Sequence, residues 1–173
     1  MYKTKTYIAG DWDHDRSAVQ KLYEWNRDDN LGLTFHDAHE ITQARDSSLN
    51  CSIKQSLAKR LDQSKTFVLI VGEKTNKLTA GSCKHCSSYD SYHGTCHRKK
   101  EISLKSYIDF ECDKAVRDKL NVIVLYRGEF CNRNTCPESV RYIGYHIPMI
   151  KRIDGVRYWN YEQIKSALDR SNR

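Results

Sequence analysis

The sequence predicts one α/β domain, residues 1–173, in which a parallel sheet of five strands lies between two layers of helices. Two short apolar runs, 66–71 (TFVLIV) and 122–126 (VIVLY), are typical of strands buried on both faces of a parallel sheet. Segments with apolar residues at helical spacing separate the candidate strands, an alternation typical of β-α-β units. A chain of 173 residues has the usual length of a single domain.

The expected elements alternate along the whole chain. Strands are expected at 4–9, 31–36, 66–71, 122–126 and 147–150, and helical stripes at 18–26, 53–61, 104–116 and 159–168. Asp13 or Asp15 is expected to cap the first helix, and Asn160 and Gln163 stand at capping-box spacing before the last. Right-handed crossovers between parallel strands leave few topologies, and five strands suit the flavodoxin-like order 2-1-3-4-5. Residues 74–102 form a polar, cysteine-rich insert after strand three.

Charge and hydropathy exclude several classes of partner. The net charge is +7, but lysines and arginines are scattered and no basic helix carries interleaved aromatics, so no nucleic acid is expected. No segment reaches the ~20 apolar residues of a membrane span, and the first residues lack the apolar core of a signal peptide. We therefore expect a soluble, cytoplasmic protein with no membrane partner.

The expected ligand site lies beyond the carboxyl ends of the strands, where open parallel sheets bind ligands. This rule selects residues 10–13 after strand one, His36 and Asp37 after strand two, and the segment after Val71. Three acidic residues after strand one would repel a flavin phosphate, and strand three ends in Val-Gly-Glu rather than in a phosphorylatable aspartate. No GxGxxG or GxxxxGK[ST] sequence occurs. A site that acts on sugars and bases through carboxylates remains.

Glu111 is the most informative of these carboxylates. In a helical projection it falls between Leu104 and Tyr107, at the edge of the apolar stripe of the third helix. A half-desolvated carboxylate there should form an ion pair or meet a ligand that carries positive charge. Breaking a nicotinamide N-glycosidic bond creates such charge on the ribose. The plainer alternative is a surface ion pair with Lys114 or Lys105.

Four segments together resemble a known bacterial family. They are 7–15 (YIAGDWDHD), 33–40 (LTFHDAHE), 66–73 (TFVLIVGE) and 107–116 (YIDFECDKAV). In order and spacing they are similar to TIR-like proteins of the Thoeris anti-phage system, the ThsB TIR-like group. The resemblance runs from about residue 4 to 168 and implies a three-layer, flavodoxin-like and TIR-like fold.

The resemblance also implies an activity. Family members cleave NAD⁺ as substrate, release nicotinamide, and can convert the ADP-ribosyl group into a cyclic or conjugated signal for a separate effector, ThsA. Their third helix carries a W-x-x-x-E-like motif with a catalytic glutamate, which Tyr107 and Glu111 match, with tyrosine in place of tryptophan. A phage component as trigger and assembly into a homo-oligomer belong to the same expectation.

By position, other residues would line the nucleotide crevice. The resemblance places Ala9, Gly10 and Asp11 there, and His36 and Asp37 at the start of the loop after strand two. Asp37 would orient a ribose hydroxyl or merely start the loop. Tyr107 and Trp12 would pack against a base or the nicotinamide ring. Cys112, next to Glu111, is expected to be a packing residue rather than a nucleophile.

The cysteines of the insert suggest a structural zinc site. Cys83 and Cys86 form a C-x-x-C knuckle, and Cys96 offers a third thiolate. The fourth ligand is open among His85, His93, His97 and Cys136. The alternative is a polar lid that carries reduced thiols.

The sequence is compatible with two other functions. A nucleoside deoxyribosyltransferase-like enzyme would use a glutamate nucleophile on an N-glycosidic bond and ignore NAD⁺. A non-catalytic TIR-like adaptor would work by self-assembly and would bind its partners without Glu111.

Overall fold

A computed structural model describes residues 5–33, 35 and 49–172. Its central sheet is parallel and has the order β1-β2-β5-β6, with β1 at Lys5–Ala9, β2 at Ser64–Val71, β5 at Asn121–Tyr126 and β6 at Tyr145–Pro148. The two apolar runs of the sequence are the two central strands. They are buried on both faces, as predicted, because helices cover both sides of the sheet.

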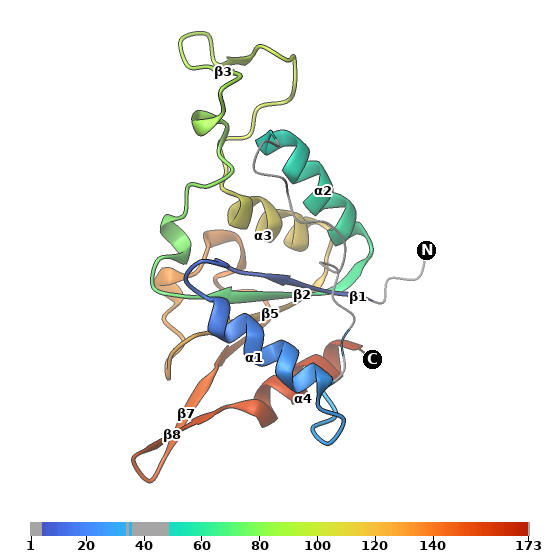
Figure 1. The fold of residues 1–173 in the computed structure, drawn as a ribbon, viewed down its shortest axis with the longest axis vertical. Coiled ribbons are helices and arrows are strands. Elements are labelled where there is room, and N and C mark those ends of the chain that lie inside the picture. The colour runs from blue at the N-terminus through green and yellow to red at the C-terminus, as the bar shows by residue number, and fades with distance from the viewer. Residues whose placement is uncertain (1–4, 34, 36–48, 173) are drawn as a thin grey trace.

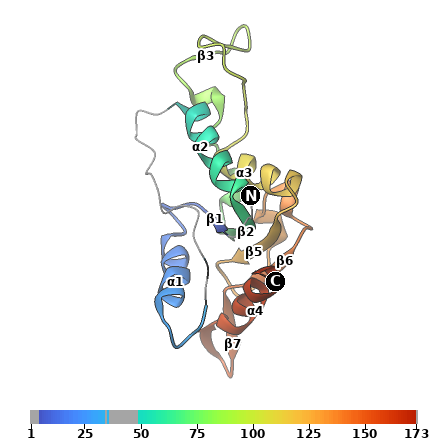
Figure 2. The ribbon, with the colours of Figure 1, turned by 90° about the vertical axis from the view of Figure 1, so that its right-hand side faces the viewer.

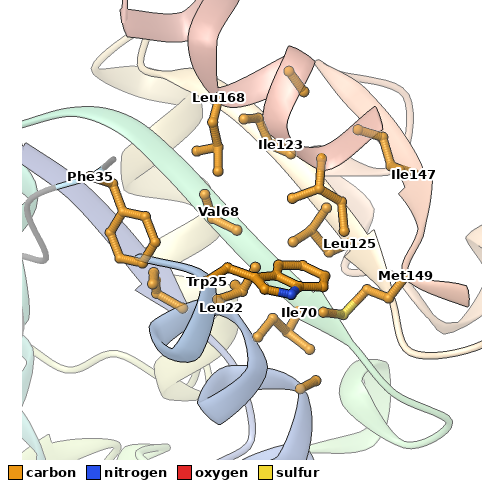
Figure 3. Packing of buried hydrophobic residues seen from close by; sticks show 14 of the residues in the cluster. Leu22, Trp25, Phe35, Val68, Ile70, Ile123, Leu125, Ile147, Met149 and Leu168 are labelled. Atoms are coloured by element: carbon orange, nitrogen blue, oxygen red, sulfur yellow. The ribbon is translucent and has the colours of Figure 1, made fainter. Parts of the chain in front are cut away.

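Two helices cover each face of the sheet (Figures 1 and 2). α2 (Asn50–Asp62) and α3 (Tyr107–Arg117) lie on one side, and α1 (Arg16–Arg27) and α4 (Tyr161–Asn172) lie on the other. Each pair buries its own apolar cluster against the strands. Figure 3 shows the second cluster, in which Leu22 and Trp25 of α1 lie over Val68 and Ile70 of β2.

The predicted strand at 31–36 is not confirmed, so the five-stranded sheet and its full order remain a prediction. Leu31 and Gly32 form a turn, and neither Leu33 nor Phe35 is in a strand; Thr34 and His36 lie outside the described residues. Side chains of the neighbouring helices α1 and α4 form hydrogen bonds with this backbone. Asn26 accepts a hydrogen bond from the Phe35 amide (2.8 Å), and Tyr161 and Lys165 donate to the carbonyls of Leu31 and Gly32.

The end of the chain also differs from the prediction. Beyond β6 an antiparallel hairpin follows, formed by β7 (Ile150–Ile153) and β8 (Val156–Trp159), and it projects from the body of the molecule (Figure 1). Trp159, expected to open the last helix, therefore ends β8. A two-residue turn at Asp154-Gly155, in which both residues have positive φ, joins these two strands of four residues each.

The insert between β2 and α3 has little regular structure. It contains short 3-10 turns at Thr75–Lys77 and Cys83–His85 and a two-residue hairpin of β3 (Tyr89–Asp90) and β4 (Thr95–Cys96). Two further 3-10 turns, Arg133–Thr135 and Glu138–Val140, follow β5. In Figure 1 the β3–β4 hairpin extends far beyond α2 and α3. Among the described helices, none is long and apolar enough to cross a membrane.

Candidate functional site

The loop after β1 closes on itself through Asp11. One oxygen of its carboxylate accepts a hydrogen bond from the Asp13 amide (3.1 Å), and the other meets His14 Nδ1 at 2.7 Å. The Asp11 carbonyl accepts from the amides of His14 and Asp15. Asp11, a predicted crevice residue, thus shapes the turn that precedes α1. Trp12 stands out from that turn, 46% exposed.

An ion pair between a buried carboxylate and a partly exposed guanidinium lies at the same edge of the sheet. Asp15 is 1% exposed, and Arg127, which directly follows β5, donates to its Oδ1 over 3.0 Å. Asp15 stands at the N-cap of α1 but makes no side-chain capping bond, because its carboxylate turns toward Arg127 and Gly72 instead. A β-carbon at Gly72 would lie 2.5 Å from Asp15 Oδ1. Burial outweighs Arg127 and raises the pKa of Asp15.

Glu111 lies inside the molecule, between α3 and the sheet. It is 5% exposed, and its carboxylate accepts a hydrogen bond from the hydroxyl of Tyr7 in β1. Tyr7 is itself fully buried and stacks on Phe67 of β2, with ring centroids 5.9 Å apart. The surface ion pair considered from the sequence is therefore wrong for Glu111. Lys105 pairs with Asp113 instead, and Lys114 pairs with Asp62 and Asp118.

The N-terminal cap of α3 fixes where the helix begins and so where Glu111 lies along it. Ser106 caps the helix by accepting the Asp109 amide (3.1 Å), and Glu111 follows little more than one turn later. Its neighbour Cys112 is completely buried, and burial raises the pKa of that thiol well above its usual value. Cys112 is therefore a protonated packing residue, as the sequence predicts.

Tyr107 joins α3 to the insert and to α2. Its hydroxyl donates to Asn50 Oδ1 (2.8 Å), and its amide donates to the Ala80 carbonyl (2.8 Å). Its ring lies directly against Gly81, where a β-carbon would come within 2.4 Å of Cδ1. Gly81 has φ +92°, a backbone conformation that glycine adopts readily. Burial raises the pKa of the Tyr107 hydroxyl.

The predicted crevice residues lie on different sides of the sheet. Ala9 belongs to the cluster beneath α3, the side of Glu111. Gly10 faces Ile70 and Val19 on the α1 side. His36 and Asp37 lie outside the described residues. Sequence reasoning missed Tyr7 and Arg127, although strand alternation and the crevice rule point to these two positions.

The cysteines of the insert gather around one cavity. It is lined by Cys51, Cys83, Cys86, Cys96, Tyr89, Lys100 and Glu101. As they are placed, no three His, Cys, Asp or Glu side chains within 5–33, 35 and 49–172 are grouped closely enough to hold a metal ion.

None of the four residues considered as the fourth ligand of the predicted zinc site lines this cavity. Cys136 is buried in the cluster beneath α3, and His93 Nδ1 is 2.6 Å from Asp90 Oδ2 in the hairpin turn. His85 and His97 are exposed and do not line the cavity. Cys51, at the start of α2, does line it, and no spacing rule connects it to a knuckle that begins 32 positions later.

A comparison with protein families supports the resemblance seen in the sequence. Residues 7–80 match the family model described as Thoeris protein ThsB, TIR-like domain. The match includes most of β1 and all of α1, α2 and β2 and ends before Cys83, so Tyr107 and Glu111 lie outside it. No curated protein sequence matches the chain.

Proposed function

Since the match over residues 7–80 supports a Thoeris ThsB TIR-like protein, with a role in anti-phage defence, we propose that this chain cleaves NAD⁺. The bond that breaks joins the nicotinamide nitrogen to C1′ of its ribose. The bonding electrons go to the nitrogen, nicotinamide leaves as a neutral molecule, and the positive charge moves to the ribose. Water then adds to C1′ and loses a proton to solvent, giving ADP-ribose, or a nitrogen of the adenine adds and gives a cyclic product. A conjugated product arises when another nucleophile adds.

Burial of Glu111 is the observation that carries this proposal. A carboxylate that is 5% exposed and fixed by the Tyr7 hydroxyl keeps one orientation while charge develops on a bound ribose. Its electrostatic effect is large because little water screens it. A leaving group that departs neutral needs no general acid, so one carboxylate suffices for the chemistry.

The remaining contacts with the substrate are proposed from the resemblance. Ala9, Gly10 and Asp11 would follow the nucleotide along the carboxyl end of β1. Trp12, about half exposed in the loop after β1, would pack against a base or the nicotinamide ring. His36 and Asp37, which lie outside the described residues, would also contact the substrate. The signal produced would act on a ThsA-like effector, so that the two proteins communicate through a small molecule.

Glu111→Gln tests the assignment. The amide keeps the size of the side chain and can still accept from Tyr7, but the charge is lost. We expect NAD⁺ turnover, followed as nicotinamide release by mass spectrometry, to fall about 10²–10³-fold. Asp113→Asn is the matched control, because it removes a carboxylate from the surface of the same helix and should leave turnover unchanged.

The same assay separates the other functions. Turnover within a few-fold of the unsubstituted protein in Glu111→Gln, with folding verified by circular dichroism, would contradict the catalytic role. Cleavage of free nucleosides but not of NAD⁺ would instead indicate a deoxyribosyltransferase-like enzyme. Absence of any turnover in activated extract, with partner binding that survives Glu111→Gln, would indicate an adaptor.

A further inference from the structure

Four of the seven cysteines meet where α2 begins, at the base of the insert. They come from three separate segments. Cys51 is the second residue of α2, Cys83 and Cys86 flank a 3-10 turn, and Cys96 ends β4. All four are free thiols around the same cavity. Such convergence from distant parts of the chain is unusual for cysteines that only fill a polar loop.

The backbone around these cysteines is organised for sulfur ligands. The Cys86 amide donates to the Cys83 carbonyl (2.9 Å), which forms a tight C-x-x-C turn, and the Ser103 amide donates to Cys83 Sγ (3.3 Å). Cys96 pairs with Tyr89 across the β3–β4 hairpin, and the Tyr89 amide donates to the Cys86 carbonyl. The hairpin thus returns Cys96 to the C-x-x-C turn.

A buried cation stands beside the thiols. Lys54, one helical turn after Cys51, is 5% exposed. In the described part of the chain its ammonium bonds only to uncharged oxygens: the Ser103 carbonyl and hydroxyl and the Lys105 carbonyl. It also interacts electrostatically with Cys83, Asp109 and Cys51. A buried ammonium is stabilised by nearby negative charge, and thiolates at Cys51 and Cys83 would add to the charge of Asp109.

We propose that Cys51, Cys83, Cys86 and Cys96 bind one Zn²⁺ as four thiolates. Four protons leave to solvent on binding, and the cluster of four thiolates with one divalent ion carries a net charge of −2, which Lys54 and Lys100 offset. Zinc–sulfur bonds of about 2.3 Å set the sulfurs about 3.8 Å apart in a tetrahedron, so the thiols that now line the cavity close around the ion. Four thiolates leave no open coordination position, so the site is structural rather than catalytic.

The zinc site ties the insert to the helix layer. The Cys83 amide donates to the Ser103 carbonyl (2.9 Å), and Asn50, next to Cys51, bonds both to the Ser82 carbonyl and to the Tyr107 hydroxyl. An ion held at Cys51 and Cys83 therefore fixes the first turn of α2, both ends of the insert and the start of α3. This inference concerns the stability of the insert and does not depend on the reaction proposed for Glu111.

Metal analysis of the full-length chain tests the site. Protein purified with a reductant and without chelator should contain one zinc per chain by elemental analysis. After zinc is replaced by Co²⁺, the absorption spectrum should show a tetrahedral d–d band and the charge-transfer intensity of four thiolates. Cys51→Ser should weaken zinc binding by at least about 100-fold, since loss of even a supporting partner costs up to that much. Cys131→Ser, the matched control, removes a thiol that does not line this cavity and should bind zinc like the unsubstituted protein.

Three outcomes would overturn the proposal. They are a chain that neither contains zinc nor takes it up after reduction, a Cys51→Ser protein with unchanged zinc affinity, and disulfides among the four cysteines in place of bound metal. If Cys51→Ser does not fold, the cobalt spectrum of the unsubstituted protein decides, because three thiolates give a weaker charge-transfer band than four.

Discussion

Tyr7 and Glu111 form the contact that defines the candidate site at the scale of single residues. Both side chains are buried, and their hydrogen bond joins the middle of β1 to the second turn of α3. A hydrogen bond to an ionised carboxylate is among the stronger ones in proteins and also sets its orientation. Tyr7 is therefore a positioning residue for the carboxylate that we propose acts on the ribose.

Tyr7→Phe should impair turnover more than it impairs folding. Loss of a charge-assisted bond worth about 1.5–3 kcal/mol corresponds to a fall of about 10–100-fold in the rate of nicotinamide release. The loss should appear in kcat rather than in KM, because the bond orients the carboxylate that acts on the transition state. Within the described residues the Tyr161 hydroxyl bonds to backbone, at Leu31, so Tyr161→Phe should lower stability and leave kcat unchanged. An unchanged kcat in Tyr7→Phe would show that Tyr7 is merely structural.

Single glycines determine how neighbouring elements fit together. Gly144 precedes β6 and has φ +78°, and a β-carbon there would lie only 2.0 Å from the carbonyl oxygen of Val122 in β5. Gly155, in the β7–β8 turn, has nearly the same φ of +79° but nothing within 4 Å of the same position. The two glycines thus share a left-handed backbone and differ in crowding.

Alanine substitutions at these two positions should separate the cost of a left-handed backbone from the cost of a steric clash. Gly155→Ala should cost only the left-handed conformation, about 1–2 kcal/mol. Gly144→Ala should cost at least about 2 kcal/mol more, because the clash is with backbone and β6 must move away from β5. Urea denaturation of the two variants measures the difference in the free energy of unfolding. Equal losses would mean that β6 adjusts without cost.

The whole molecule is a compact three-layer body from which two hairpins project, β3–β4 on the side of α2 and α3 and β7–β8 on the side of α1 and α4 (Figure 1). The connection between β2 and α3 spans residues 72–106, far longer than the ~2–6 residues usual between such elements. It ends at Tyr107, only four residues before Glu111. Its conformation therefore sets the start of the helix that carries the proposed catalytic residue.

We predict that the isolated protein turns over NAD⁺ slowly until a trigger orders the insert or assembles several copies. A displacement of ~1 Å at a reacting group can cost ~10²-fold in rate, so a small movement of α3 suffices. The measurement compares nicotinamide release by dilute pure protein, by concentrated protein and in extract from phage-infected cells. Full activity in the dilute protein, independent of its concentration, would refute this regulation and leave the role of Glu111 intact.

Local sequence patterns alone determined several elements of the fold and the choice of candidate residues. The runs 66–71 and 122–126 became the central strands because uninterrupted apolar residues need cover on both faces. The stripe of Ala18, Val19, Leu22 and Trp25 is buried as α1, and Ser106 caps α3. The family resemblance and the choice of Glu111 as a candidate catalytic residue also came from short segments of sequence, since motifs depend on neighbouring residues.

Only the tertiary structure decided which distant residues meet. Tyr7 and Glu111 are 104 positions apart, and Asp15 turned from its helix cap to Arg127, 112 positions away. The sequence predicts a strand at 31–36, but its described backbone donates a hydrogen bond to Asn26 and accepts hydrogen bonds from Tyr161 and Lys165. Cys51, rather than Cys136 or a histidine, shares the cavity of the C-x-x-C turn. Spacing along a chain constrains contacts within one element, whereas contacts between elements depend on how the layers pack, which no local pattern encodes.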